Sequence, residues 1–213
     1  MLLKHRPPGI ESQPVELRDG LEHLEQSSIA VLRWLNANKV DYVVVGPVAR
    51  AIRGDLDARG AVAIVPAPYE RNFERLCSAL VAEHAGLRTG MGPPGSSARP
   101  RASAIKLTAD KLARGRRWML RFGHYDLDIE GDGSRGEGAR TSGSPGAAVA
   151  PRYQELLYEA GRFELAEGLR VEVASPEDLE HYSHVRRTGA PPEFRVTRKA
   201  GAEHEPASEH DRG

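Results

Sequence analysis

The sequence predicts an α/β fold in which a small, mixed and twisted β-sheet is flanked by helices. Two observations carry this prediction. First, two short runs, 41–45 and 61–65, are rich in β-branched and apolar residues, as buried strands are. Second, apolar residues recur at helical spacing before the first run and after the second. Since only one short helix fits between the two runs, strands and helices alternate, which favours a sheet packed against helices.

The first half of the chain can be divided into five elements. In order, these are a helix over 21–35, a strand over 41–45 closed by Gly46, a helix over 47–53, a strand over 61–65, and a helix from Tyr69 that ends at Gly86. Pro47 is tolerated because it falls in the first helical turn. Pro66 and Pro68 stop the second strand, and the last helix shows an apolar stripe on one face.

For the second half of the chain, the sequence predicts two hairpins, and a helix follows each of them. The expected elements are paired strands over 118–122 and 125–129 around Gly123-His124, a helix over 152–160, a hairpin around Glu167-Gly168, and a helix from Ser175 to about Arg187. Strand alternation places Asp126, Asp128 and Glu130 on one face of the second strand. That face is interpreted either as a metal or general-base site or as an ordinary solvent-exposed polar face.

The composition predicts one domain over residues 18–197 with disordered terminal segments. We expect residues 1–17 and 198–213 to be disordered and the stretches near 86–103 and 131–149 to be flexible loops. Thirty basic and thirty acidic residues cancel, so bulk charge predicts no partner. The single cysteine, Cys77, excludes an intrachain disulfide and suits a reducing compartment. No apolar run approaches the ~20 residues of a membrane span and no signal-peptide core is present, so a cytoplasmic protein without membrane partners is expected.

Several pieces of the chain resemble, in order and spacing, the abortive-infection-type (AbiEii-like) nucleotidyltransferases of the DNA polymerase β-like superfamily. They are Val43-Val44-Val45-Gly46 followed by Ala49 and Gly54, then Ile64-Val65, Pro68, Asn72, Leu76 and Ala79-Leu80, then Gly123-His124-Tyr125-Asp126-Leu127, and finally Tyr153, Leu156, Ala160 and 171–179. The resemblance covers residues 20–187 and implies a nucleotidyltransferase-type fold. It also implies a turn that cradles nucleotide phosphates and three carboxylates that hold two Mg²⁺ ions, with RNA or protein as acceptor.

The chain differs from that family at the positions that would bind the metal ions and the nucleotide phosphates. Ala61 and Ala63 occupy the positions of the paired metal ligands, and a methyl group cannot bind a cation. Pro47, beside Gly46 in the expected nucleotide-binding cleft, has no N–H to offer a phosphate. Further along, Ser183 stands where the family often has lysine, and Gly189-Ala190-Pro191-Pro192 replaces its Arg-x-Lys-Asp.

Only Asp126, or its neighbour Asp128, corresponds to a catalytic carboxylate of the family. One carboxylate leaves most positions of an octahedral Mg²⁺ without a protein ligand, so no metal site and no cofactor are expected, and Mg²⁺ only if the protein is active. Asp55-x-Asp57 has the spacing of a relocated ligand pair, but its context favours a solvated turn. His181 and His184 with Glu177 resemble a zinc cluster superficially, and a polar helix surface is the favoured interpretation.

A basic stretch suggests contact with nucleic acid. Between Arg99 and Arg121 there are eight lysines and arginines and one acid, and an aromatic residue lies among them. The residues expected to form this surface are Arg114, Arg116, Arg117 and Trp118. A solvated surface balanced by acids elsewhere explains the same residues.

Three functions remain open from the sequence. The leading hypothesis is a catalytically impaired nucleotidyltransferase-fold protein that binds nucleotide or RNA as a regulatory module. By the resemblance, it would belong to a toxin–antitoxin or phage-defence setting, with an antitoxin as protein partner. The second is an active metal-dependent transferase that moves a nucleoside monophosphate to RNA or protein with relocated carboxylates. The third is a non-catalytic protein-interaction domain.

Overall fold

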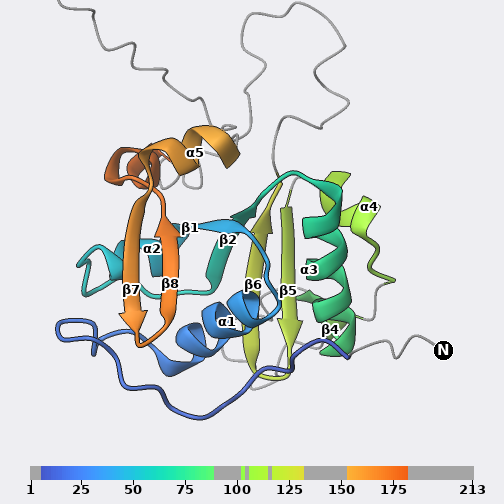
Figure 1. The fold of residues 1–213 in the computed structure, drawn as a ribbon, viewed down its shortest axis with the longest axis horizontal. Helices are drawn as coiled ribbons and strands as arrows, with labels where there is room; N and C mark the ends of the chain where they lie inside the picture. The colour runs from blue at the N-terminus through green and yellow to red at the C-terminus, as the bar shows by residue number, and fades with distance from the viewer. Residues whose placement is uncertain (1–5, 89–101, 104–105, 115–116, 132–152, 182–213) are drawn as a thin grey trace, which may run out of the picture.

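The computed structural model describes residues 6–88, 102–103, 106–114, 117–131 and 153–181. Its elements are α1 (Gln26–Ala37), β1 (Tyr42–Val45), α2 (Gly46–Ile52), β2 (Val62–Pro66), α3 (Glu70–Ala82), β3 (Gly86–Arg88), β4 (Ala102–Ser103), α4 (Ala109–Arg114), β5 (Arg117–Phe122), β6 (Tyr125–Glu130), α5 (Tyr153–Glu159), β7 (Gly161–Ala166) and β8 (Leu169–Val173). A further helix begins at residue 176. The strands form one mixed sheet with helices around it, which confirms the α/β class (Figure 1).

Strand order in the sheet is β4-β3-β5-β6-β2-β1-β8-β7. β1 and β2 lie in the middle, where every residue of both strands is buried, and this is why their sequences are continuous apolar runs. β1 pairs antiparallel with β2 and parallel with β8, and β2 pairs parallel with β6. The two hairpins predicted from turn residues, β5–β6 and β7–β8, are confirmed. Gly123 and Gly168 turn them with positive φ angles of 59° and 72°.

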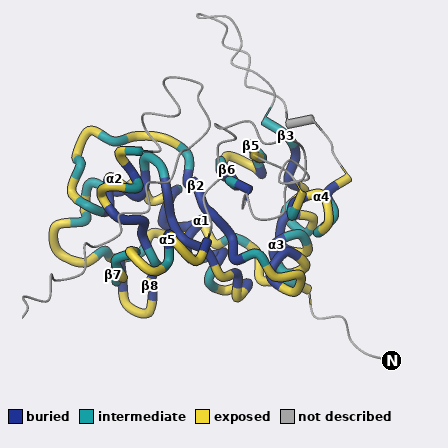
Figure 2. Tube along the Cα trace, turned by 90° about the horizontal axis from the view of Figure 1, so that it is seen from above, coloured by how far each residue is buried: buried dark blue, intermediate teal, exposed yellow. Residues whose placement is uncertain are grey.

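Helix α1 lies across one face of the sheet and supplies much of the core. Trp34 of α1 is buried, and its ring lies 5.0 Å from that of Phe122 in β5. The phenol of Tyr42 in β1 donates to Asn36 Oδ1 of the same helix at 2.8 Å. Phe122 and Tyr42 therefore mark the sheet face that α1 covers, and the alternate strand residues belong to the opposite face. Figure 2 shows the buried residues gathered where α1 meets the strands.

Three predicted boundaries are corrected. α1 begins at Gln26, because the preceding residues form turns from which Leu24 still reaches the core. α3 ends at Ala82, and His84, with φ of 54°, reverses the chain there in place of Gly86. Gly86 instead begins β3, so the ends of the expected 86–103 loop are paired strands, with 89–101 outside the described residues.

The prediction that differs most from the structure concerns the N-terminal segment. Residues 1–17 were expected to be disordered, yet residues 6–17 lie along the domain. Ile10 N donates to Glu83 at the end of α3, Ser12 shares a hydrogen bond with the Tyr125 phenol, and Leu17 bridges to Ala166 of β7. The proline-rich composition wrongly predicted disorder, because the contacts that order this segment all join residues far apart in sequence. The tail 198–213, most of the 131–149 stretch and the end of the last helix lie outside the described residues.

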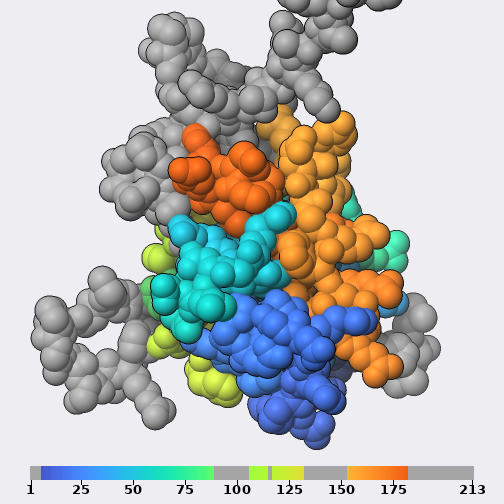
Figure 3. Space-filling view, turned by 90° about the vertical axis from the view of Figure 1, so that its left-hand side faces the viewer, coloured from blue at the N-terminus to red at the C-terminus, as the bar shows by residue number. Residues whose placement is uncertain are grey.

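One side of the molecule is assembled from distant parts of the chain. In Figure 3, α2 (cyan), the N-terminal segment and α1 (blue), and β7–β8 (orange) pack side by side. Arg53, at the end of α2, fixes this arrangement by donating to the carbonyls of Val173 and Ala174 at 3.1 and 2.7 Å. Its guanidinium also lies 5.2 Å from the Phe163 ring centroid, a cation–π distance. Among the described residues, no helix combines the length and apolar character needed to cross a bilayer.

Candidate functional site

Strand pairing brings the predicted cleft residues into one row. Val45 at the end of β1 lies opposite Ala63 of β2, and Ala63 in turn lies opposite Asp128 of β6. The turn at Gly46, the alanine positions and the acidic strand are thus neighbours in the sheet. The row offers little space at its centre, however, because Ala63 has no exposed surface.

The turn after β1 is packed by its proline. Gly46 adopts a φ of 70°, and Pro47 follows in the first turn of α2. The Pro47 ring contacts Gly60 so closely that a Cβ added at Gly60 would lie 2.9 Å from Pro47 Cγ. The position at which a phosphate would need an N–H group is therefore occupied by an apolar ring that is held against the next loop.

The two predicted catalytic carboxylates are both paired with arginines. Arg121 of β5 donates to both oxygens of Asp126 at 2.7 Å, and Arg88 of β3 lies 3.1 Å from the same carboxylate. Asp128 accepts from Arg88 and from Arg117, each at 2.9 Å. Six residues form this set, which we call the arginine–carboxylate ladder: Arg88, Arg117, Arg121, Asp126, Asp128 and Glu130, the last being 3.2 Å from Arg117.

The electrostatics of the ladder favour the ionised form of Asp126. Burial acts to raise the pKa of Asp126, but the hydrogen bonds and charges of Arg121 and Arg88 outweigh burial, and the net pKa lies below its ordinary value. The same pairing raises the pKa of Arg121. Three positive and three negative side chains sum to zero, so the ladder presents no net charge to a cation or to a phosphate.

The residues at this site do not fit Mg²⁺. An ion beside Asp126 or Asp128 would have to displace arginines that already fill the carboxylate oxygens, and the neighbouring alanines supply no ligand. Among the described residues, no group of three or more His, Cys, Asp and Glu side chains is arranged to hold a metal. This arrangement also corrects the interpretation of Asp128 as a residue on a solvent-exposed face, since it is 3% exposed.

The expected nucleic-acid surface is not one surface. Arg117 and Trp118 are consecutive residues of β5 and so project to opposite sides of the sheet, Arg117 toward the ladder and Trp118 onto the core that α1 covers. Arg114 is exposed at the end of α4, and Arg116 lies outside the described residues. Among the described residues of this set, Arg117 and Trp118 therefore do not share one face of the sheet.

The remaining sequence candidates give ordinary structural interpretations. Asp55 lies in a turn after α2, where it pairs with Arg50 at 2.7 Å and accepts from Asp57 N, and this supports the solvated-turn interpretation of Asp55-x-Asp57. Cys77 is half-buried on α3, and burial raises the pKa of its thiol, as expected for a packing residue. His184 lies outside the described residues.

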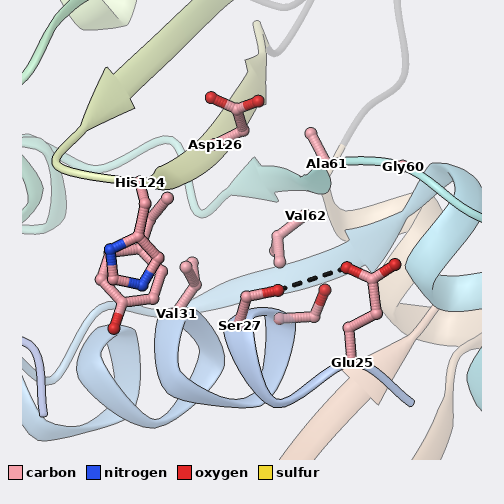
Figure 4. Close-up of a pocket in the computed structure, with 10 residues that line it drawn as sticks. Glu25, Ser27, Val31, Gly60, Ala61, Val62, His124 and Asp126 are labelled. Carbon is pink, nitrogen blue, oxygen red and sulfur yellow. Dashed lines mark hydrogen bonds between the residues drawn. The ribbon is translucent and has the colours of Figure 1, made fainter. Parts of the chain in front are cut away.

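A pocket of about 240 Å³ lies beside the predicted cleft, with Ala61 and Asp126 among its residues. Its residues come from the start of α1, the start of β2 and the β5–β6 turn: Glu25, Ser27, Ser28, Val31, Gly60, Ala61, Val62, His124, Tyr125 and Asp126. In Figure 4 the side chains of Ala61 and Asp126 point away from α1, whereas Val62 points toward it. Gly46, Pro47 and Ala63 of the predicted cleft are not among its residues.

Sequence reasoning missed the arginine partners and the pocket. The two-residue turn at Gly123-His124 fixes the β5–β6 register, so Arg121 opposite Asp126 was readable from the hairpin alone. No local pattern predicts the pairing of Arg88 with these carboxylates, because β3 is short and lies far from β5 in the sequence. Comparison with protein-family models and with curated proteins finds no match to this chain.

Proposed function

We propose that this chain is a nucleotidyltransferase-like scaffold of the AbiEii type that has lost metal-dependent transfer and acts as a nucleotide-binding regulatory module. The observation that carries the proposal is the pairing of Asp126 and Asp128 with three arginines, next to Ala61 and Ala63. Support for the scaffold comes from the β1–α2–β2 unit with β6 parallel to β2, which puts the acidic strand beside the alanine strand.

The energetic argument concerns the transition state. Two Mg²⁺ ions stabilise the charge that develops on the transferred phosphoryl group by several kcal/mol. Without them the rate falls by roughly 10³ or more. The arginines are poor substitutes for the ions, because their charges are already paired with the carboxylates of the same ladder.

The alternative of an active transferase requires relocated carboxylates. Asp55 is the residue that would have to move, and it is held in its turn by Arg50 and by Asp57 N. The impaired scaffold is therefore the better supported function. An antitoxin-like protein partner and RNA remain part of the proposal only through the family resemblance.

Calorimetric titration with ATP, CTP, GTP and UTP, each with and without Mg²⁺, tests the proposal. We expect nucleotide binding whose affinity is unchanged by Mg²⁺, and no transfer of radiolabel to bulk RNA or protein. Tight binding that requires Mg²⁺, or label transfer that Asp126→Ala abolishes, would overturn it. A salt-sensitive mobility shift with RNA and no nucleotide binding would assign the module to RNA instead.

The double variant Ala61→Asp with Ala63→Asp provides a matched control. On the proposed account this variant alone gains little Mg²⁺ affinity, because Arg88 and Arg117 still occupy Asp128. Adding Arg88→Met frees one oxygen of Asp128 and part of Asp126, so the triple variant should bind Mg²⁺ more tightly than the double variant. Equal affinity in both variants would show that the arginines do not block the site.

A further inference from the structure

The outer edge of β7 is covered over only part of its length. β7 is the last strand of the sheet, so no further strand lies along its outer side. Toward the end of β7, Leu17 bridges Ala166, and Arg18 N donates to Leu165 O at 2.9 Å. Residues 161–164 have no such cover within the described part of the chain. Natural proteins usually cover an open sheet edge, because its unpaired backbone groups are a template for another strand.

The hydrogen bonds of the neighbouring strand show which backbone groups of this edge face outward. Ala174 N donates to a carbonyl of β1, so alternate residues of β8 turn their backbone groups toward β1 and the others toward β7. Val171 is one of the others, and Phe163 lies opposite it in pairing that is regular up to Glu164. Both backbone groups of Arg162 and the N–H of Glu164 therefore point away from β8, toward the open side.

The side chains of this edge define what a partner strand should carry. Phe163 is half-buried against the core, with the Arg53 guanidinium 5.2 Å from its ring centroid. Arg162 and Glu164 project from the other face, with side chains that are 74% and 28% exposed. A strand that pairs here is expected to place an acid beside Arg162, an apolar or aromatic residue beside Phe163 and a base beside Glu164.

A segment of this chain outside the described residues meets all three requirements. Residues 193–195 read Glu-Phe-Arg, which is the reverse of the Arg-Phe-Glu of residues 162–164. Val196 and Thr197 follow, and β-branched residues favour a strand. Two prolines precede the segment, and proline is tolerated at the first residue of an edge strand. The segment therefore has the composition of a short edge strand.

Charge decides the direction in which this segment can pair. In a parallel arrangement, Glu193 lies beside Arg162 and Arg195 lies beside Glu164, so both pairs are opposite in charge. In an antiparallel arrangement about the two phenylalanines, each charge meets a like charge, and like charges directly opposite each other destabilise a sheet. Parallel pairing is therefore favoured.

The path of the chain allows the same direction. β8 ends at Val173, which lies opposite Gly161 at the start of β7, and the last described helix begins at residue 176. Figure 1 shows this helix (deep orange) at the end of the sheet where β7 starts. The twelve residues from 182 to 193 can span up to about 40 Å, whereas β7 is only about 20 Å long. A segment that arrives there and follows the edge runs parallel to β7.

We propose that residues 193–195 pair with β7 as an additional, parallel strand of the sheet. The side-chain partners are Glu193 with Arg162, Phe194 with Phe163, and Arg195 with Glu164. In this register Phe194 N donates to Arg162 O and Glu164 N donates to Phe194 O, and both edge groups face the open side. The pairing ends where Arg18 already occupies the edge. The inference goes beyond the proposed function, because it involves neither the ladder nor a nucleotide, and it closes the edge against other chains.

Amide hydrogen exchange of the full-length chain, followed by NMR, tests this pairing. Phe194→Pro removes the N–H that the pairing needs, so the Glu164 amide should exchange roughly 10-fold faster or more in this variant than in the wild type. Thr197→Pro is the matched control, since it lies beyond the pairing and should leave the exchange of Glu164 unchanged. Equal exchange rates in the wild type and Phe194→Pro, or an equal effect of both proline variants, would overturn the proposal.

A charge exchange tests the register. Glu193→Arg places two arginines side by side and should speed exchange of the Glu164 amide by roughly 2- to 5-fold. Adding Arg162→Glu restores an opposite pair and should recover the slow exchange. Arg162 also pairs with Glu172 in β8, so Arg162→Glu alone weakens the hairpin, and recovery in the double variant is specific to the proposed contact. A double variant that exchanges faster than either single variant would overturn this register.

Sedimentation at several protein concentrations separates pairing within one chain from pairing between two chains. If the segment binds its own sheet, the exchange of the Glu164 amide does not depend on protein concentration. Slow exchange that appears only as dimers form would assign the segment to a second copy and overturn pairing within the chain.

Discussion

Arg88→Met removes one arginine from the ladder. We expect it to lower the free energy of unfolding more than a substitution at the end of a strand usually does. Arg88 contacts Asp128 at 2.9 Å and Asp126 at 3.1 Å, and its side chain is 23% exposed. A hydrogen bond to a charged group contributes about 1.5–3 kcal/mol. Arg121 and Arg117 still hold the two carboxylates after the change, so we expect a loss of about 2–4 kcal/mol in the free energy of unfolding rather than the sum of both contacts.

Urea unfolding followed by circular dichroism measures this loss. With a slope of about 2 kcal/mol/M, a loss of 3 kcal/mol lowers the midpoint by about 1.5 M. Arg162→Met is the matched control, since Arg162 also pairs with an acid across two strands, Glu172 at 2.7 Å, but its side chain is 74% exposed. That pair should contribute less than about 1 kcal/mol. Equal midpoints for the two variants would refute the reasoning that burial gives the ladder its strength.

A double-mutant cycle assigns the effect to the contact itself. Arg88→Met, Asp128→Asn and the combined variant should show a coupling of about 1 kcal/mol or more, because each single change removes the direct contact while Arg117 stays on Asp128 and Asp126 stays on Arg88. Additive losses would mean that Arg88 stabilises the sheet by packing alone.

Three further predictions follow from the described contacts. Asn72→Ala should cost about 2–4 kcal/mol in urea unfolding, because this fully buried amide accepts from Asp41 N and donates to two carbonyls; a loss below 1 kcal/mol would contradict it. Gly60→Ala should destabilise the protein, since φ is +153° and the new Cβ would meet Pro47 at 2.9 Å, and Pro47→Ala should recover part of the loss; no recovery would show that backbone strain dominates. Asp126 has a lowered folded pKa, so its stabilisation is complete above the unfolded pKa of about 3.9 and is lost as pH falls through the folded value. Asp126→Asn should therefore flatten the acid side of the stability–pH curve, and an unchanged curve would argue against the pairing.

The family resemblance is a hypothesis that the fold accommodates. The structure places the turn at Gly46, the alanine strand and the acidic strand side by side, which any version of the hypothesis needs. It also places arginines on Asp126 and Asp128 and a proline ring at the turn, which gives a chemical reason why a metal-dependent reaction is absent from the proposed function.

Local features of the fold were determined by the sequence alone. The β-branched runs of β1 and β2, the amphipathic α3 and the two hairpins depend on side-chain periodicity and turn chemistry within a few residues, and each was predicted. The partner of Asp126 also follows from a local rule, because a two-residue turn sets which residues lie opposite each other in β5 and β6. The predicted helix boundaries were wrong where tertiary packing sets the end of the helix without a local sequence signal, as at the start of α1 and at His84.

Tertiary structure alone decided the character of the site. Arg88 reaches Asp128 from forty residues away, and residues 6–17 dock against α3 and β7. Contacts of this kind depend on which strands become neighbours and how closely helices approach them, and the free energy that selects them is distributed over the whole core. The sequence thus determined that an acidic strand would form and that Arg121 would lie opposite Asp126, and the assembled sheet determined that Arg88 would pair with both aspartates.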